Sequence, residues 1–327
     1  MGKNDVSVKG WLMDRKRYAD LFNGILFDGR QVIMSDNLEP VDSQSNLLVL
    51  DKGKKIRTVE RYRDIVMRWN NNAYLVLMAT EIQDSVNYAM PVRKMLYDSL
   101  SYTDQMRELW QSLPNDAPEK QIGTKEFFSR FRKKDKIAPV ITIVFYYGDE
   151  WDGNVDLYDM FGFDSELLMD ENIDVLKKYI SNYNINLFNP NKMEDLSVFK
   201  TDLHIVFDML RYKGNKEKLL EYTEKNRKYF SCVDYESAQA IKTLLGTDVL
   251  LRGKLNSKKK EGNDVCKALQ DLYDDGVADG KELGREEGRE EGKILTYFEF
   301  GLTPEEISAK VSRDIEYVNQ ILGLQLV

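Results

Sequence analysis

Three polar side chains that could bind a metal ion and orient a water molecule lie next to apolar segments of the sequence. Asp64 precedes the segment IVMRW, whereas Glu81 and Gln83 follow the uncharged run YLVLMAT. Burying a carboxylate without a partner costs several kcal/mol. Either a metal ion or a hydrogen-bonded structural partner would compensate that cost.

The segments on either side of these residues predict a pair of strands. Residues 73–84 begin with an apolar run after three asparagines, which is typical of a buried central strand. Because side chains alternate along a strand, Glu81 and Gln83 share a face with Leu75, whereas Ile82 points the other way. Residues 57–69 predict a second strand, at least from Tyr62 onward, with Asp64 on one face. The asparagine turn makes an antiparallel pair, so Asp64 and Glu81 are expected at one end of the sheet.

Carboxylate chemistry follows from this arrangement. Two carboxylates, Asp64 and Glu81, together with a backbone carbonyl, that of Ile82, and water suit Mg²⁺ or Mn²⁺. Such a metal lowers the pKa of a bound water and neutralises charge on a phosphate. Gln83 cannot ionise, so it would orient the attacking water and not deprotonate it. The same residues also fit a structural hydrogen-bonded pair, and the pattern alone does not separate the two.

The scarcity of histidine and cysteine excludes other chemistries. His204 is the only histidine of 327 residues and lies in an apolar pattern with helical spacing, which predicts a packed helix position. Histidine-based nucleases and Ser-His or Cys-His hydrolases are therefore improbable. Cys232 and Cys266 are isolated, which excludes a disulfide framework and a cysteine-rich zinc site. No secretory signal or bilayer-spanning apolar run is present, so we expect a cytoplasmic protein without a membrane partner.

The net charge of −8 is unevenly distributed along the chain. The first 270 residues carry 41 acidic and 41 basic residues, and the excess acids all follow. Residues 120–136 hold seven bases and two acids, and residues 251–260 hold five bases and no acid. Basic segments on a neutral body can approach a phosphate backbone, although solvated loops are the commoner cause of such runs.

The remaining segments outline an α/β domain with helical parts after it. Residues 14–27 predict a helix that places Tyr18 and Leu21 on one stripe, with Asp20 beside it. Further predicted elements are short strands at 31–34 and 46–50, a helix at about 88–112 with Pro91 in its first turn, a strand at 137–147, and mainly helices from 156 to 251.

The C-terminal sixty residues differ from the rest. Glycines recur every four residues, at Gly276, Gly280, Gly284, Gly288 and Gly292. This spacing either stacks small residues on one helix face, allowing close approach of a second helix and so a homo-oligomer, or marks a charged linker of marginal order. Residues 302–324 predict two short helices resembling a helix-turn-helix unit, which would serve DNA contact or packing.

Four segments in order resemble the PD-(D/E)XK nuclease-like family of recombination-promoting nucleases, also described as putative transposases. They are RYRDIVMRW, AYLVLMATEIQD, YAMPVRKMLYDSL and IAPVITIVFYYGDEWDG, and the resemblance covers about residues 14–152. The resemblance implies a restriction-endonuclease-like αβββαβ core and a Mg²⁺-dependent DNA endonuclease. It assigns the motif aspartate to Asp64, the Glu-x-Gln to Glu81 and Gln83, and a first-helix acid to Asp20.

The resemblance also indicates residues near the substrate and one departure. Arg93 and Tyr97 match a Pro-x-Arg-x-x-x-Tyr pattern, so they would either contact phosphate or brace the strand ends. Gln83 stands where the wider superfamily has lysine, which shifts the burden of catalysis onto the metal. For phosphate contacts in the basic segment we select four further residues, namely Arg130, Arg132, Lys133 and Lys134.

The sequence therefore predicts three parts: a nuclease-like core at 1–152, a helical extension at 153–265 and a glycine-repeat tail at 266–327. We expect a metal-dependent DNA endonuclease acting in recombination, DNA mobility or defence. The rival interpretations are a catalytically weak or inactive nuclease-fold scaffold that binds DNA, and a nuclease that acts on RNA. Sequence preference, oligomeric state and biological trigger are not encoded in any pattern that we recognise.

Overall fold

The computed structural model describes residues 3–41, 44–50, 56–62, 65–70, 73–79, 86–113, 123–148, 150–162, 170–246 and 262–323. The chain divides into two compact units, Met1–Asn263 and Asp264–Val327. The strands are β1 (Leu38–Pro40), β2 (Gln44–Leu50), β3 (Ile56–Tyr62), β4 (Ile65–Trp69), β5 (Ala73–Ala79), β6 (Val140–Phe145) and β7 (Asn186–Phe188). The helices of the first unit are α1 (Lys3–Leu12), α2 (Arg15–Phe27), α3 (Met90–Gln111), α4 (Thr124–Ser129), α5 (Asp170–Lys177), α6 (Leu203–Leu210), α7 (Lys216–Lys225), α8 (Arg227–Phe230) and α9 (Tyr235–Leu244).

A five-stranded mixed sheet in the order β1-β4-β5-β6-β7 forms the centre of the first unit. Strands β1, β4 and β5 are antiparallel, and β5, β6 and β7 are parallel. The parallel β5–β6 pair needs a crossover connection, and α3 lies within it. Strands β2 and β3 form a separate antiparallel hairpin.

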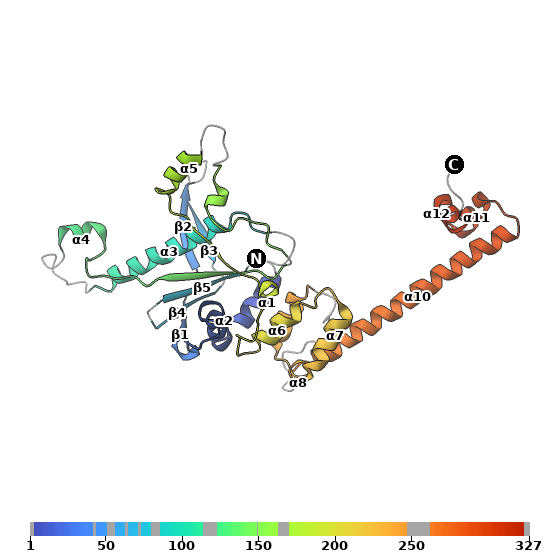
Figure 1. Cartoon of the computed structure of the whole chain (residues 1–327), viewed down its shortest axis with the longest axis horizontal. Coiled ribbons are helices and arrows are strands. Elements are labelled where there is room, and N and C mark those ends of the chain that lie inside the picture. Colours follow the sequence, from blue (N-terminus) through green and yellow to red (C-terminus); the bar gives the residue numbers. More distant parts are fainter. Residues whose placement is uncertain are drawn as a thin grey trace. The chain divides into compact units, whose positions relative to one another are not determined.

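Helices cover both faces of this sheet (Figure 1). On one face, the Tyr18 hydroxyl of α2 donates a 2.7 Å hydrogen bond to the Leu75 carbonyl of β5. On that face Phe145 of β6 also packs against Phe207 of α6, with ring centroids 5.6 Å apart. Helix α3 covers the opposite face, where its Tyr97 packs with Val144 of β6 in a buried cluster.

The face of α3 that meets the sheet is largely polar. Asp98 is 2% exposed and accepts hydrogen bonds from Lys94 (3.0 Å), Thr142 (2.5 Å) and Tyr183 (2.5 Å). Burial and the bond to Asp98 raise the pKa of the Tyr183 hydroxyl, so it stays protonated and donates at neutral pH. Further along α3, Gln105 exchanges two hydrogen bonds with the backbone of Ala138, at 2.7 and 3.1 Å. Helix α3 is thus fixed to the sheet by hydrogen bonds to buried partners as well as by apolar contact.

Arg17 of α2 ties the N-terminal helices to the helical half of the first unit. Its guanidinium pairs with both carboxylate oxygens of Asp202, at 2.8 and 3.1 Å, and also bonds to the Ser237 hydroxyl at 2.8 Å. The Tyr229 hydroxyl donates to the same Asp202 carboxylate at 2.7 Å. These contacts join α2 to residues on both sides of α7 and α8, so the helical half packs as part of the same unit.

The second unit contains a long helix, α10 (Val265–Glu299), followed by α11 (Pro304–Val311) and α12 (Ile315–Ile321). Ile294, Ile307 and Val318, one from each helix, form its buried core. The Arg313 guanidinium pairs with both oxygens of Glu290 at 2.9 Å and lowers the pKa of that carboxyl. This small helical core closes the end of α10.

Several predicted elements are confirmed. The chain is an α/β protein with a helical C-terminal half, and β4 and β5 form the expected antiparallel pair. Helix α2 ends at Asp28 and Gly29, which both have positive φ, and α3 carries Pro91 in its first turn. The two short helices predicted at 302–324 are α11, which begins with a capping box of Thr303 and Glu306, and α12; of the two alternatives left for the glycine repeat, the structure has the continuous helix.

Other elements differ from the prediction. The strand predicted at 31–34 is wrong, because the backbone N–H groups of Val32 and Ile33 bond instead to the side-chain oxygen of buried Asn23. The segment 57–69 contributes to two strands in different sheets, β3 and β4. Strand β7 lies within the part expected to be helical and joins the central sheet. No helix among the described ranges is long and apolar enough to cross a bilayer.

Replacing Asp98 tests whether its buried hydrogen bonds hold α3 on the sheet. Asp98→Ala leaves the buried Lys94 ammonium without its carboxylate, so we expect the free energy of unfolding to fall by about 3–5 kcal/mol. Urea denaturation measures this change. The matched control is Asp104→Ala on the same helix, whose exposed pair with Arg107 is worth about 1 kcal/mol or less. Equal losses in the two variants would contradict a special role for Asp98.

Replacing one glycine of the repeat tests whether a second helix packs against the glycine face of α10. A Cβ at Gly284 would meet nothing within 4 Å, so Gly284→Ala should stabilise the helix by up to about 1 kcal/mol. Slower amide hydrogen exchange in α10 of the full chain measures this gain. Gly301→Ala is the control and should lower stability, because Gly301 has a φ of +86°, which strains any residue with a Cβ. Faster exchange in Gly284→Ala would indicate that a second helix packs against the glycines.

Candidate functional site

The frame of the predicted metal site is the antiparallel pair of β4 and β5. Ile65, which follows Asp64 in the sequence, pairs with Leu77, four residues before Glu81. The start of β4 and the end of β5 therefore lie at the same end of the sheet. Asp64, Glu81, Ile82 and Gln83 themselves lie outside the described residues, so their assignment as a metal site stays a prediction.

The first turns of α3 carry the two residues predicted to contact phosphate or brace the strands. Tyr97 is 4% exposed and packs against Val66, Met90 and Val144 in the core. The guanidinium of half-buried Arg93 lies 5.7 Å from the centroid of the Tyr97 ring. This geometry makes Tyr97 a packing residue that supports Arg93, and leaves Arg93 as the member of the pair with access to solvent.

Asp20, the predicted acid of the first helix, lies on α2 and is 2% exposed. Its carboxylate accepts hydrogen bonds from the Lys200 N–H, the Thr201 N–H and the Thr201 hydroxyl, at 2.6–2.9 Å. These donors belong to the loop that leads into α6. Asp20 thus holds that loop in place, and any metal contact would have to share these oxygens.

The basic segment around α4 is organised by its two acidic residues. Glu126 accepts from the backbone N–H groups of Lys133 (3.0 Å) and Gly123 (3.3 Å), and these bonds lower the pKa of its carboxyl. Asp135 pairs with Arg132 at 2.7 Å, and this partner lowers the pKa of the Asp135 carboxyl in the same way. Both acids are therefore used to shape the segment, and Arg132 is engaged with Asp135.

The other three predicted phosphate-binding residues of this segment are exposed. Arg130 has a positive φ of 51° at the end of α4, and Lys133 and Lys134 follow in the adjoining turn. Arg130, Lys133 and Lys134 make no side-chain ion pair within the described part of the chain. The structure thus separates the four predicted residues into one structural cation, Arg132, and three available ones.

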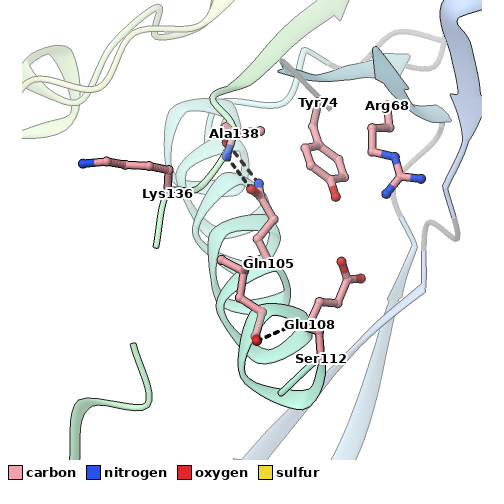
Figure 2. Close-up of a pocket in the computed structure, with 8 residues that line it drawn as sticks. Arg68, Tyr74, Gln105, Glu108, Ser112, Lys136 and Ala138 are labelled. Atoms are coloured by element: carbon pink, nitrogen blue, oxygen red, sulfur yellow. Dashed lines mark hydrogen bonds between the residues drawn. The ribbon is translucent and has the colours of Figure 1, made fainter. Parts of the chain in front are cut away.

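A shallow pocket lies beside this segment, next to Tyr74 at the start of β5 (Figure 2). Glu81 follows the other end of that strand in the sequence. Its volume is about 300 Å³, and its lining includes Arg68, Tyr74, Glu108 and Lys136. Arg68 also pairs with Glu39 at 2.6 Å, which raises the pKa of the guanidinium and keeps it charged. Figure 2 shows the Tyr74 hydroxyl and the Arg68 guanidinium side by side across from α3.

His204 is placed as predicted, on a helix. It is half-buried on α6, and its Nδ1 lies 2.5 Å from the Thr201 carbonyl oxygen. Among the residues that the structure describes, no three His, Cys, Asp or Glu side chains are grouped as metal ligands. Comparison with protein-family models, curated proteins and solved structures finds no match for this chain.

Sequence reasoning missed two features of these surfaces. The Asp98 cluster was signalled only by Lys94 and Asp98 at helical spacing and by Thr142 within an apolar strand. The exposed pair Phe127 and Phe128 stands among lysines, and the sequence analysis considered only the charge of this segment.

Replacing Asp20 separates its structural role from a role at a metal. Asp20→Ala leaves the partly buried N–H and O–H donors of residues 200 and 201 without their acceptor, so we expect a loss of about 2–3 kcal/mol of stability in urea. Thr201→Val removes one donor only and should cost about 1 kcal/mol. Calorimetric titration of Asp20→Asn with Mn²⁺ gives the second readout. Unchanged stability together with lost Mn²⁺ binding would contradict the structural role.

Proposed function

We propose that this protein is a metal-dependent DNA endonuclease that hydrolyses phosphodiester bonds. The observation that carries the proposal is the antiparallel register of β4 and β5, in which Ile65 pairs with Leu77. Asp64 precedes the first of these residues, and Glu81 follows the second by four positions. Two carboxylates from neighbouring strands at one sheet end are a donor set that suits Mg²⁺ or Mn²⁺.

The order of elements around the sheet supports the same proposal. Helix α2, strands β1, β4 and β5, helix α3 and strand β6 follow one another, apart from the inserted β2–β3 hairpin and α4. This is an αβββαβ succession, the order implied by the resemblance to PD-(D/E)XK nucleases. A restriction-endonuclease-like core is therefore the fold that we propose for residues 1–152.

The residues of the chain have separate roles in this proposal. Asp64, Glu81 and the Ile82 carbonyl hold the ion, and Gln83 orients the attacking water by hydrogen bonding. The bound ion supplies Lewis acidity and charge for the phosphate oxygens. Because Gln83 carries no positive charge, the metal would supply more of the charge at the phosphate, and we propose Arg93 on α3 as the solvent-accessible side chain that assists it.

The scaffold interpretation is favoured by one observation. Asp20, which the resemblance places among the site acids, is engaged by three donors of the loop before α6. A protein that kept the fold with fewer metal ligands would bind DNA without cutting it. The two interpretations differ in whether Asp64 and Glu81 matter for hydrolysis.

Nicking of supercoiled plasmid with Mg²⁺ or with EDTA tests the proposal. Mutation of groups that merely orient metal ligands costs about 10–100-fold, so Asp64→Ala and Glu81→Ala should each lower the nicking rate by more than about 100-fold. Gln83→Ala, which removes an orienting group, should lower the rate by about 10–100-fold. Asp174→Ala, an exposed acid on α5, is the control and should nick like the wild type.

The outcomes separate the two interpretations. Nicking that survives in both Asp64→Ala and Glu81→Ala would refute the assigned site. A wild type that shifts DNA but never nicks it, with either metal, would establish the scaffold interpretation. Calorimetric titration with Mn²⁺ should show a site that Glu81→Ala removes and Asp174→Ala keeps.

A further inference from the structure

The α4 segment, defined here as residues 123–137, presents an unusually one-sided charge. Its two acids are occupied, Glu126 by backbone N–H groups and Asp135 by Arg132. Its remaining cations are exposed and make no ion pair with any described residue, and they are Lys125, Arg130, Lys133, Lys134 and Lys136. The segment therefore carries a net positive charge, with six basic residues against two acidic ones.

Two large aromatic side chains stand among these cations. Phe127 is 54% exposed and Phe128 is 80% exposed. The rings of Phe127 and Phe128 lie 6.1 Å apart at a steep angle of 75°, and Phe127 lies 6.2 Å from the Trp110 ring of α3. Trp110 and Phe127 thus support each other edge to face, and at least one face of Phe128 is open to solvent.

We infer that the α4 segment binds single-stranded nucleic acid, with unpaired bases stacked on Phe127 and Phe128 and phosphates held by the surrounding lysines. Stacking platforms next to cationic grooves are the general means of binding single strands without reading sequence. The inference rests on the proposed function, because it names the substrate class of the nuclease as DNA with unpaired bases.

The pair of phenylalanines argues against two other polyanionic partners, namely duplex nucleic acid and an anionic membrane surface. The base faces inside a duplex are already stacked on their neighbours, so exposed phenyl rings gain nothing from them. A membrane-surface helix needs a long apolar face, whereas α4 has six residues, and Phe127 and Phe128, being consecutive, point in directions about 100° apart.

The pocket next to the segment extends the same surface. Lys136 belongs to the α4 segment and is also a lining residue of the pocket that contains Tyr74 and Arg68, although its ammonium points away from those two side chains (Figure 2). A strand that leaves the phenylalanines along Lys136 would thus meet a phenol and a guanidinium next. The pocket thus adds one aromatic ring and one guanidinium, although Arg68 is paired with Glu39 and Glu108 also lines the pocket.

Binding of labelled oligothymidylate in EDTA, followed by fluorescence anisotropy, tests the inference on the full chain. The double variant Phe127→Ala/Phe128→Ala should bind at least about tenfold more weakly, and Phe128→Ala alone should weaken binding by a smaller factor. Binding of a duplex of equal length should change less than about twofold. Tyr179→Ala is the control, because Tyr179 is 85% exposed and lies outside the segment.

The salt dependence separates stacking from charge. Lys133→Ala/Lys134→Ala should flatten the plot of log affinity against log salt by about 0.7 for each phosphate that a lysine no longer neutralises. The phenylalanine variants should leave that slope unchanged. Circular dichroism spectra and melting temperatures equal to those of the wild type confirm that the variants fold.

Two results overturn the inference. One is oligothymidylate binding that is the same in the wild type and the double phenylalanine variant. The other is tighter binding of the wild type to vesicles of anionic phospholipid than to oligothymidylate, abolished by the same variant. Because EDTA prevents hydrolysis, either failure leaves the nicking test of Asp64 and Glu81 intact, and failure of that test leaves this one intact.

Discussion

The buried carboxylate of Asp98 is the constraint on which the arrangement of the first unit depends. A charge that is 2% exposed must be compensated, and Lys94, Thr142 and Tyr183 do so from the same helix, from β6 and from the chain before β7. Apolar packing would permit α3 to slide or rotate over the sheet. Thr142 and Tyr183 lie outside α3, and their directional bonds to Asp98 fix the register of α3 on β6.

Fixing α3 links two distant ends of the sheet. Helix α3 begins at Met90, shortly after Glu81 in the sequence. Further along the helix, Gln105 bonds to the backbone of Ala138. The neighbouring Pro139 carbonyl accepts a hydrogen bond from the Tyr74 N–H at the start of β5. Since β5 runs from Tyr74 toward Glu81, α3 returns along its length. The residues next to the proposed metal site and those next to the α4 segment therefore lie toward opposite ends of α3.

The apolar periodicity of the sequence was sufficient to predict the β4–β5 pair, α2, α3 and the capped helix α11, because local patterns and caps determine these elements. It failed at 31–34, where the side chain of Asn23 takes the backbone bonds that a strand would use. It also could not show that Lys133 is more available for a phosphate contact than Arg132, since only the fold brings Asp135 to the Arg132 guanidinium. Long-range hydrogen bonds of single polar residues leave no periodic signal.

The net charge of −8 does not oppose binding of a polyanion. Screening limits an exposed charge to about one Debye length, roughly 10 Å at moderate salt, so the local set of groups determines the potential. In the α4 segment six basic residues stand against two carboxylates, whereas the excess acids of the chain lie after residue 270. A protein that is acidic in total can therefore present a positive platform, provided that basic residues outnumber acidic ones in that region.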